Sequence, residues 1–121
     1  MGNLAMVALG GAFGSVLRYL LSVWLNSAFP YGTLAVNIVG CFAMGLLAGY
    51  GAFMGALPEP WRIFLMVGVL GGFTTFSAFS LDVLTLVERG QVAQAAAYVL
   101  LSVGVSLFAV FGGVALVKTL S

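Results

Sequence analysis

Histidine is absent from the sequence, and cysteine occurs once, as Cys41, among 121 residues. A single cysteine excludes an intrachain disulfide. Because there is no histidine, no paired carboxylates and no base beside Cys41, we expect no catalytic residues and no enzymatic activity. No stretch rich in lysine or arginine precedes the first apolar segment, so we expect no cleaved signal peptide.

Charge is also scarce. The chain has four lysine and arginine residues and three acidic residues, while 63% of its residues are hydrophobic. A soluble domain of this size could not cover its surface with so few charges, so the composition predicts an integral membrane protein. The expected surrounding is the lipid bilayer. Nothing in the charge balance indicates a nucleic acid or a soluble protein partner.

Four apolar stretches are long enough to cross a membrane, which takes about 20 residues as a helix. The sequence therefore predicts an all-α membrane protein, one transmembrane domain over residues 1–121 with four helices. The helices are expected at about residues 4–25, 33–53, 61–87 and 92–117. An even number of spans places both termini on one side of the membrane.

The basic residues hardly bias the orientation of the chain in the membrane. Arg62 and Lys118 lie on the side with the termini, and Arg89 lies on the other side. Arg18 counts with Arg89 if its side chain reaches that interface. The positive-inside rule therefore gives a bias close to zero. Two outcomes stay open. Either the chain inserts in both orientations and forms an antiparallel homodimer, or other signals decide its orientation.

Glycine recurs at a spacing of four within three of the predicted helices. Such pairs let helix backbones approach closely in lipid, so they predict tight packing. Four thin, closely packed helices leave little room, so any conduit would be narrow and lie at a subunit boundary. The pairs are Gly10 and Gly14, Gly45 and Gly49, and Gly68 and Gly72.

The third predicted helix contains the stretch GGFTTFSAFS, residues 71–80. Glycine and β-branched threonine are poor helix formers, so we expect this helix to be broken within the membrane. A broken membrane helix offers free carbonyls to cations. If two chains pack antiparallel, the two breaks can meet on the twofold axis, where four carbonyls would suit a structural Na⁺.

Hydrogen-bond donors occur inside the spans, where each needs a partner. Asn37 is too polar to be satisfied within its own helix, so we expect an interhelical or functional role. Serine and threonine hydroxyls commonly bond to a carbonyl one turn earlier, which is the simpler interpretation for each of them. Besides Asn37, the donors are Thr33, Thr74, Thr75, Ser77, Ser80, Tyr98, Ser102 and Ser106.

The only charge expected deep in a span is the cation Arg18, while Glu59, Asp82 and Glu88 fall toward helix ends or loops. Cation and proton transporters generally need a buried acid, so this inventory favours an anion. Arg18 could collect anions at a vestibule or anchor the helix by snorkelling to the interface. The rings of Phe76 and Phe79 have positive edges that could complement the donors.

These residues resemble a known family, the small fluoride channels called Fluc or CrcB. The similarity covers almost the whole chain. It rests on Gly11-x-x-Gly14-x-x-x-Arg18, on Gly32-Thr33-Leu34-x-x-Asn37, on residues 71–80, and on Tyr98-x-x-x-Ser102-x-x-x-Ser106. The third of these motifs is highly specific.

The resemblance implies a passive, fluoride-selective channel that exports cytoplasmic fluoride across the bacterial plasma (inner) membrane. It implies a dual-topology antiparallel homodimer with two pores, each built from both subunits, and a central Na⁺ held by the carbonyls of Gly71 and Thr74. Arg18 is expected at a vestibule. The expected pore residues are Asn37, Thr75, Ser77, Phe76, Phe79, Tyr98, Ser102 and Ser106.

Two other functions fit a chain of this size. Small multidrug exporters also have four helices, but they need a carboxylate in the first helix, where this chain has Arg18. A non-conducting assembly subunit would account for the glycine pairs. It leaves Asn37 and the hydroxyls of the third helix unexplained.

Overall fold

The computed structural model describes residues 2–121, and four of its helical segments are long and apolar enough to cross a membrane. The prediction of an all-α protein with four spans is confirmed. The elements are α1 (Gly2–Leu25), α2 (Tyr31–Phe53), α3 (Glu59–Arg62), η1 (Ile63–Leu70), α4 (Gly71–Phe73), α5 (Ser77–Glu88) and α6 (Val92–Leu120). The third span is the run from α3 to α5.

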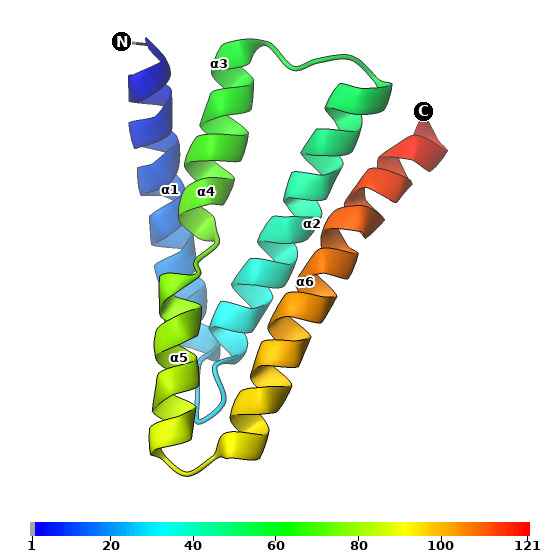
Figure 1. The fold of residues 1–121 in the computed structure, drawn as a ribbon. Coiled ribbons are helices and arrows are strands. Elements are labelled where there is room, and N and C mark those ends of the chain that lie inside the picture. The colour runs from blue at the N-terminus through cyan, green and yellow to red at the C-terminus, as the bar shows by residue number, and fades with distance from the viewer. Residues whose placement is uncertain (1) are drawn as a thin grey trace.

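The spans alternate in direction. Both termini and the loop between α2 and α3 lie at one end, and the turns from α1 to α2 and from α5 to α6 lie at the other (Figure 1). Large apolar side chains cover the outside of the bundle, among them Trp24 and Phe108, which are 75% and 81% exposed. Apolar outer surfaces on membrane-length helices are what a multi-pass membrane protein presents to lipid.

Glycines bring α1 against the first half of the third span. A Cβ added to Gly10 would lie 2.9 Å from the Cα of Gly68, and one added to Gly72 would lie 2.7 Å from the carbonyl oxygen of Gly11. A Cβ on Gly14 would overlap the carbonyl of Val69. The backbones touch at these positions, so the tight packing expected from the glycine spacing is confirmed here.

A second glycine contact joins α2 to α6. A Cβ on Gly45 would overlap the carbonyl of Val110, and one on Gly49 would lie 3.1 Å from the Cα of Val114. From the other side, a Cβ on Gly113 would lie 2.5 Å from the carbonyl oxygen of Phe42. The two helices therefore form a closely packed pair.

The third span is interrupted, but later than the glycines suggest. Gly71 and Gly72 are still helical, and the helix stops after Phe73, where Thr74 takes an extended conformation with φ −79° and ψ 156°. Gly72 serves the contact with α1. The segment before the break, η1, is a π-helix, a rare form that often marks functional sites.

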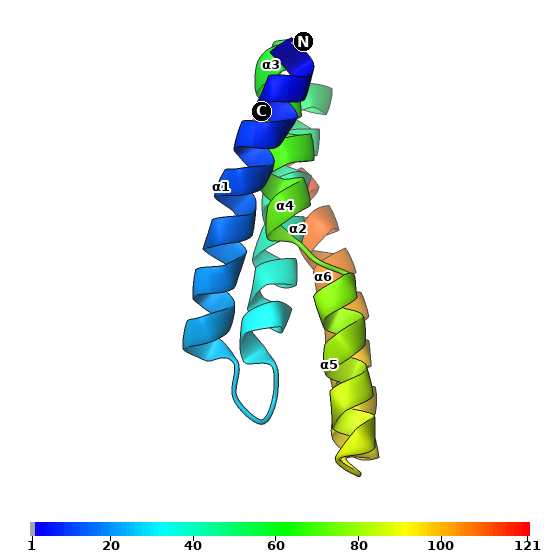
Figure 2. The same ribbon diagram turned by 90° about the vertical axis from the view of Figure 1, so that its left-hand side faces the viewer.

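The break moves the second half of the span sideways. Before it, η1 and α4 pack along α1, whereas α5 packs against α6. Figure 2 shows α5 displaced from the line of α4 and well separated from the end of α1. A cluster of buried side chains, Phe79, Leu86, Ala95 and Tyr98, holds α5 against α6. This displacement opens the space in which the candidate site lies.

Candidate ion site at the break of the third span

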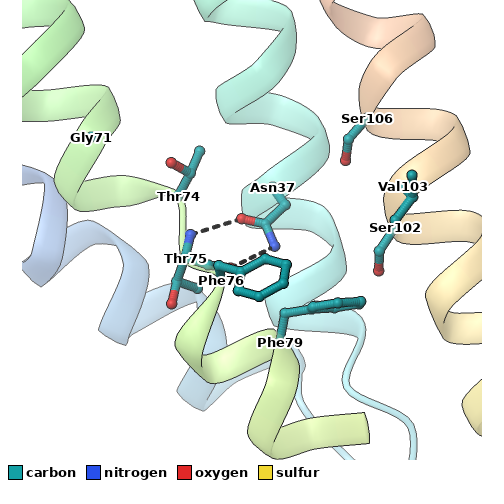
Figure 3. A pocket seen from close by; sticks show the side chains of 9 residues that line it. All are labelled: Asn37, Gly71, Thr74, Thr75, Phe76, Phe79, Ser102, Val103 and Ser106. Atoms are coloured by element: carbon teal, nitrogen blue, oxygen red, sulfur yellow. Dashed lines mark hydrogen bonds between the residues drawn. The ribbon is translucent and has the colours of Figure 1, made fainter.

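A cavity of about 420 Å³ lies beside the break, between the third span, α2 and α6 (Figure 3). It is lined by Asn37, Gly71, Thr74, Thr75, Phe76, Phe79, Ser102, Val103 and Ser106. The lining combines an amide, hydroxyls, backbone at the break and two phenyl rings. It contains no acidic and no basic side chain.

The Asn37 side chain binds the break directly. Its Oδ1 accepts a hydrogen bond from the backbone N–H of Thr75 at 2.9 Å, and its Nδ2 donates to the Thr75 carbonyl at 3.1 Å. Both partners are peptide groups that lack helical partners because the span is broken there. The interhelical role expected for Asn37 is therefore confirmed.

Gly40 makes this approach possible. It is buried on α2 one turn after Asn37, and a Cβ there would overlap Cγ2 of Thr74 and lie 3.2 Å from Cδ2 of Phe73. Only a residue without a side chain leaves the break close enough to α2 for the Asn37 amide to reach Thr75.

The two threonine hydroxyls of the break are used locally. Thr74 Oγ1 donates to the carbonyl of Leu70 at 2.9 Å, which is the bond to a carbonyl one turn earlier that is common for threonine in membrane helices. Thr75 Oγ1 accepts from the N–H of Ala78 at 3.1 Å and lies 3.4 Å from Ser77 Oγ. Thr75 Oγ1 therefore satisfies one of the N–H groups in the first turn of α5.

Across the cavity, α6 presents two hydroxyls. Ser102 and Ser106 are 6% and 8% exposed, and neither hydroxyl oxygen has a hydrogen-bond partner among residues 2–121. Figure 3 shows both side chains on α6, across the cavity from the break. Burying an unpaired hydroxyl costs free energy, so such groups indicate a missing ligand or water.

The two phenylalanines of the break differ in environment. Phe79 is buried, whereas Phe76 is 77% exposed on the open side of the cavity. Their ring centroids are 5.6 Å apart with an interplanar angle of 47°, a tilted arrangement, and both residues line the cavity. Phe79 also packs on Tyr98 at a centroid distance of 5.2 Å.

Comparison with known proteins identifies the family. Residues 5–114 match the family described as "CrcB-like protein, Camphor Resistance (CrcB)". The chain belongs to the CrcB family. A relative in Rhodospirillum centenum is 53% identical over 98% of both chains, and one in Agrobacterium fabrum is 53% identical over 99% of both. A third, in Rhizobium meliloti, is 51% identical over 99% of both. Each is named "Fluoride-specific ion channel FluC".

Membership of the CrcB family settles one expectation of the sequence analysis. Ion channels are not enzymes, so the expected lack of enzymatic activity is confirmed by what the relatives are named. The match over nearly the full chain also confirms the resemblance drawn from the motifs in the four spans.

Most of the residues predicted to form a pore in this CrcB protein come together at the cavity. Ser77 and Tyr98 do not line it, and Arg18 is half-buried on α1 away from it. Gly71 and Thr74, predicted as cation ligands, share the cavity wall. The predicted pore residues that line the cavity are Asn37, Thr75, Phe76, Phe79, Ser102 and Ser106.

Asp82 lies in the second half of the third span, six residues before the span ends at Glu88. It lines a pocket with Asn26 and Pro30 of the turn between α1 and α2, so it lies toward this end of the bundle, as the sequence analysis expects. Its Oδ2 accepts a hydrogen bond from Tyr98 at 3.0 Å, a contact that forms because α5 packs against α6.

The sequence analysis also missed Val103, which lines the cavity next to Ser102. No signal marks it, because valine is an ordinary residue on a lipid-facing helix. Metal ligands of the usual kind are absent from the described residues: no group of three or more His, Cys, Asp or Glu residues lies together between residues 2 and 121.

Proposed function

We propose that this protein is a passive, fluoride-selective ion channel that exports cytoplasmic fluoride across the bacterial plasma membrane. The observation that carries the proposal is the pair of buried, unpartnered hydroxyls of Ser102 and Ser106, facing a cavity with no charged side chain. Neutral donors hold a small anion without trapping it, as conduction requires.

The sign of the ion follows from the lining. Hydroxyl and amide N–H groups donate, and phenyl edges carry positive potential, so the cavity suits an anion. Fluoride is the anion named for the relatives at about half identity over the whole chain. Fluoride is the smallest halide and is the most costly to dehydrate, so close, strong donors compensate it best.

A second copy of the chain, packed antiparallel, completes the proposed pores. In one chain, Phe76 is 77% and Val103 is 50% exposed on the cavity wall, so that wall needs a further cover. The near-zero positive-inside bias allows insertion in both orientations. An antiparallel twofold pair has two equivalent cavities and therefore two pores, each using residues of both subunits.

A structural Na⁺ is proposed where the two breaks meet, held by the Gly71 and Thr74 carbonyls. The backbone fits this role because the N–H groups that would pair with these carbonyls in a continuous helix are bound elsewhere. Thr75 N–H bonds to Asn37, and Ala78 N–H bonds to Thr75 Oγ1. The ion would supply positive charge that joins the two subunits.

The remaining predicted residues take outer positions in this proposal. Tyr98 does not line the cavity but contacts Phe79, which does. In this proposal an ion that leaves the cavity along α6 passes Tyr98. Ser77 bonds to Thr75 at the rim, and Arg18 collects anions at a vestibule on the α1 side.

The two rival functions are disfavoured. A proton-coupled multidrug exporter needs a carboxylate in the first span, and α1 contains none. A non-conducting assembly subunit gives no reason for unpaired hydroxyls in a cavity. The relatives are named as ion channels.

The deciding experiment uses purified protein in liposomes loaded with fluoride or with chloride. We expect rapid fluoride efflux and almost no chloride efflux when a potassium ionophore supplies the counterion current. Equal rates for the two anions, or no flux above protein-free liposomes, would rule out the proposed function.

A further inference from the structure

We infer that the Asn37 side chain and the Thr75 hydroxyl act together as a clamp that keeps the Gly71 and Thr74 carbonyls free for a cation. The inference deepens the proposed function and rests on the proposed Na⁺. It makes Asn37 and Thr75 positioning residues for the cation, in addition to their place at the anion cavity.

The first step concerns Gly71. In an α-helix, each carbonyl accepts from the N–H four residues later, so the helical partner of the Gly71 carbonyl is the N–H of Thr75. That N–H instead donates to Asn37 Oδ1 at 2.9 Å. The Asn37 amide thus removes the group that would otherwise occupy the Gly71 carbonyl.

The second step concerns Thr74. The helical partner of its carbonyl is the N–H of Ala78, and that N–H donates to Thr75 Oγ1 at 3.1 Å. The Thr74 residue itself is anchored twice to Leu70, through its N–H at 3.0 Å and its hydroxyl at 2.9 Å. The Thr74 carbonyl is therefore free of its helical partner, and its direction is held by the Thr75 N–H of the same peptide group, which donates to Asn37.

The third step concerns the carbonyl that follows Thr74 in the chain. Asn37 Nδ2 donates to the Thr75 carbonyl at 3.1 Å, so this oxygen is already used. The clamp therefore leaves the carbonyls of Gly71 and Thr74 available and withholds the Thr75 carbonyl from the cation.

The clamp also joins the two proposed ion sites. Gly71, Thr74, Thr75 and Asn37 all line the anion cavity (Figure 3). An amide nitrogen carries two N–H groups, and only one of those on Asn37 is used by Thr75, so the other remains for the cavity. Because the clamp acts on the carbonyls themselves, its loss should weaken the cation site whether or not fluoride is present.

The experiment measures Na⁺ binding without any transport. The thermal unfolding midpoint of the purified protein in detergent is titrated with Na⁺ against N-methyl-D-glucamine at constant ionic strength and without fluoride. A cation that binds the folded protein raises the midpoint with its concentration, which yields an apparent Kd. For wild-type protein we expect a clear Na⁺-dependent rise.

The variants are matched pairs. Thr75→Val keeps the shape but frees the Ala78 N–H to return to Thr74, whereas Thr75→Ser keeps the hydroxyl. We expect an apparent Kd for Na⁺ raised by about tenfold or more in Thr75→Val, as the loss of about one hydrogen bond per subunit implies. The apparent Kd of Thr75→Ser should stay close to that of the wild-type protein.

Thr85→Val is the control. It removes a hydroxyl that bonds to the Leu81 carbonyl on α5, and it should bind Na⁺ normally.

Asn37 is tested in the same way. Asn37→Leu removes both bonds to Thr75 and should weaken Na⁺ binding, whereas Asn37→Asp keeps the acceptor for the Thr75 N–H and should retain Na⁺ binding while fluoride flux is lost. If Asn37→Leu does not yield folded protein, the Thr75 pair decides the question.

The possible results separate the two proposals. A wild-type midpoint that does not respond to Na⁺ overturns both the central cation and the clamp. A normal wild-type response that persists unchanged in Thr75→Val and Asn37→Leu overturns the clamp alone and leaves the proposed cation standing.

Discussion

The hydroxyl of Tyr98 donates a hydrogen bond to Asp82 Oδ2 across the contact between α6 and α5, at 3.0 Å. Tyr98 is completely buried, and its ring packs on Phe79 and, edge to face, on Phe29. This pair ties the half of the third span after the break to the last helix. It thereby fixes the position of Phe79 in the cavity wall.

Replacing Tyr98 with phenylalanine should destabilise the protein while keeping its shape. The change leaves a half-buried carboxylate without its donor, which costs about 1–3 kcal/mol. The thermal unfolding midpoint in detergent should fall. Tyr50→Phe, at a position 41% exposed, is the matched control and should leave it unchanged. Equal midpoints for Tyr98→Phe and wild type would mean that the bond to Asp82 contributes nothing to stability.

Replacing Ser102 and Ser106 together with alanine should separate stability from transport. Neither hydroxyl has a partner among residues 2–121, so their removal should leave the unfolding midpoint unchanged or raise it. The permeating anion loses two donors of about 1 kcal/mol each, so fluoride flux should fall by about thirtyfold. Flux is measured in liposomes with a fluoride electrode. A large loss of stability with normal flux would contradict this assignment.

Isoleucine at Phe76 or Phe79 should reduce fluoride flux sharply in both cases, because an aliphatic side chain has no positive ring edge. Only the replacement of Phe79 should lower the free energy of unfolding. Phe79 is buried, so its replacement should cost about 1–2 kcal/mol, whereas Phe76 is 77% exposed and contributes little within one chain. Wild-type flux in both variants would show that the rings only pack.

Neutralising Arg18 with glutamine tests whether this residue collects anions. Fluoride flux should fall at low ionic strength and recover toward wild type in high salt, because the screening length shrinks from about 30 Å at 0.01 M to about 3 Å at 1 M. Arg18→Lys keeps the charge and is the control. If Arg18→Gln conducts normally at low salt, Arg18 anchors α1 at the membrane interface instead.

Alanine at Gly40 should damage the site without touching any polar group. The new methyl group would overlap Thr74 Cγ2 and push the break away from α2, at a cost of about 1–3 kcal/mol. The hydrogen bonds between Asn37 and Thr75 would lengthen, and fluoride flux should fall. Gly51→Ala is the control on the same helix, since no atom lies within 4 Å of a Cβ there. Equal flux in the two variants would mean that the close approach of the break is not needed.

The sequence predicted the spans and much of the cavity because both depend on local features. Membrane helices must satisfy their backbone internally, so apolar length alone predicts four spans. Asn37 and Ser102 stood out because each is a polar residue in an apolar span, and Phe76 because it lies in the hydroxyl-rich stretch 71–80. Such residues can be recognised from the sequence alone.

The rest depended on how the helices meet. The start of the break could not be predicted because Gly71 and Gly72 look like helix breakers, although Gly72 provides room for Gly11 of α1. The pairing of Asp82 with Tyr98 and the place of Val103 depend on the sideways displacement of α5. The dimer, the pore number and the central Na⁺ stay predictions.

The glycine contacts divide the chain into two mechanical units. Backbone-to-backbone contact resists sliding between α1 and the η1–α4 segment, and between α2 and α6. Within the third span, the helix that runs from one unit to the other is interrupted at residues 74–76, where Thr74 is extended. A ligand bound at this interruption would therefore stiffen the connection between the two units.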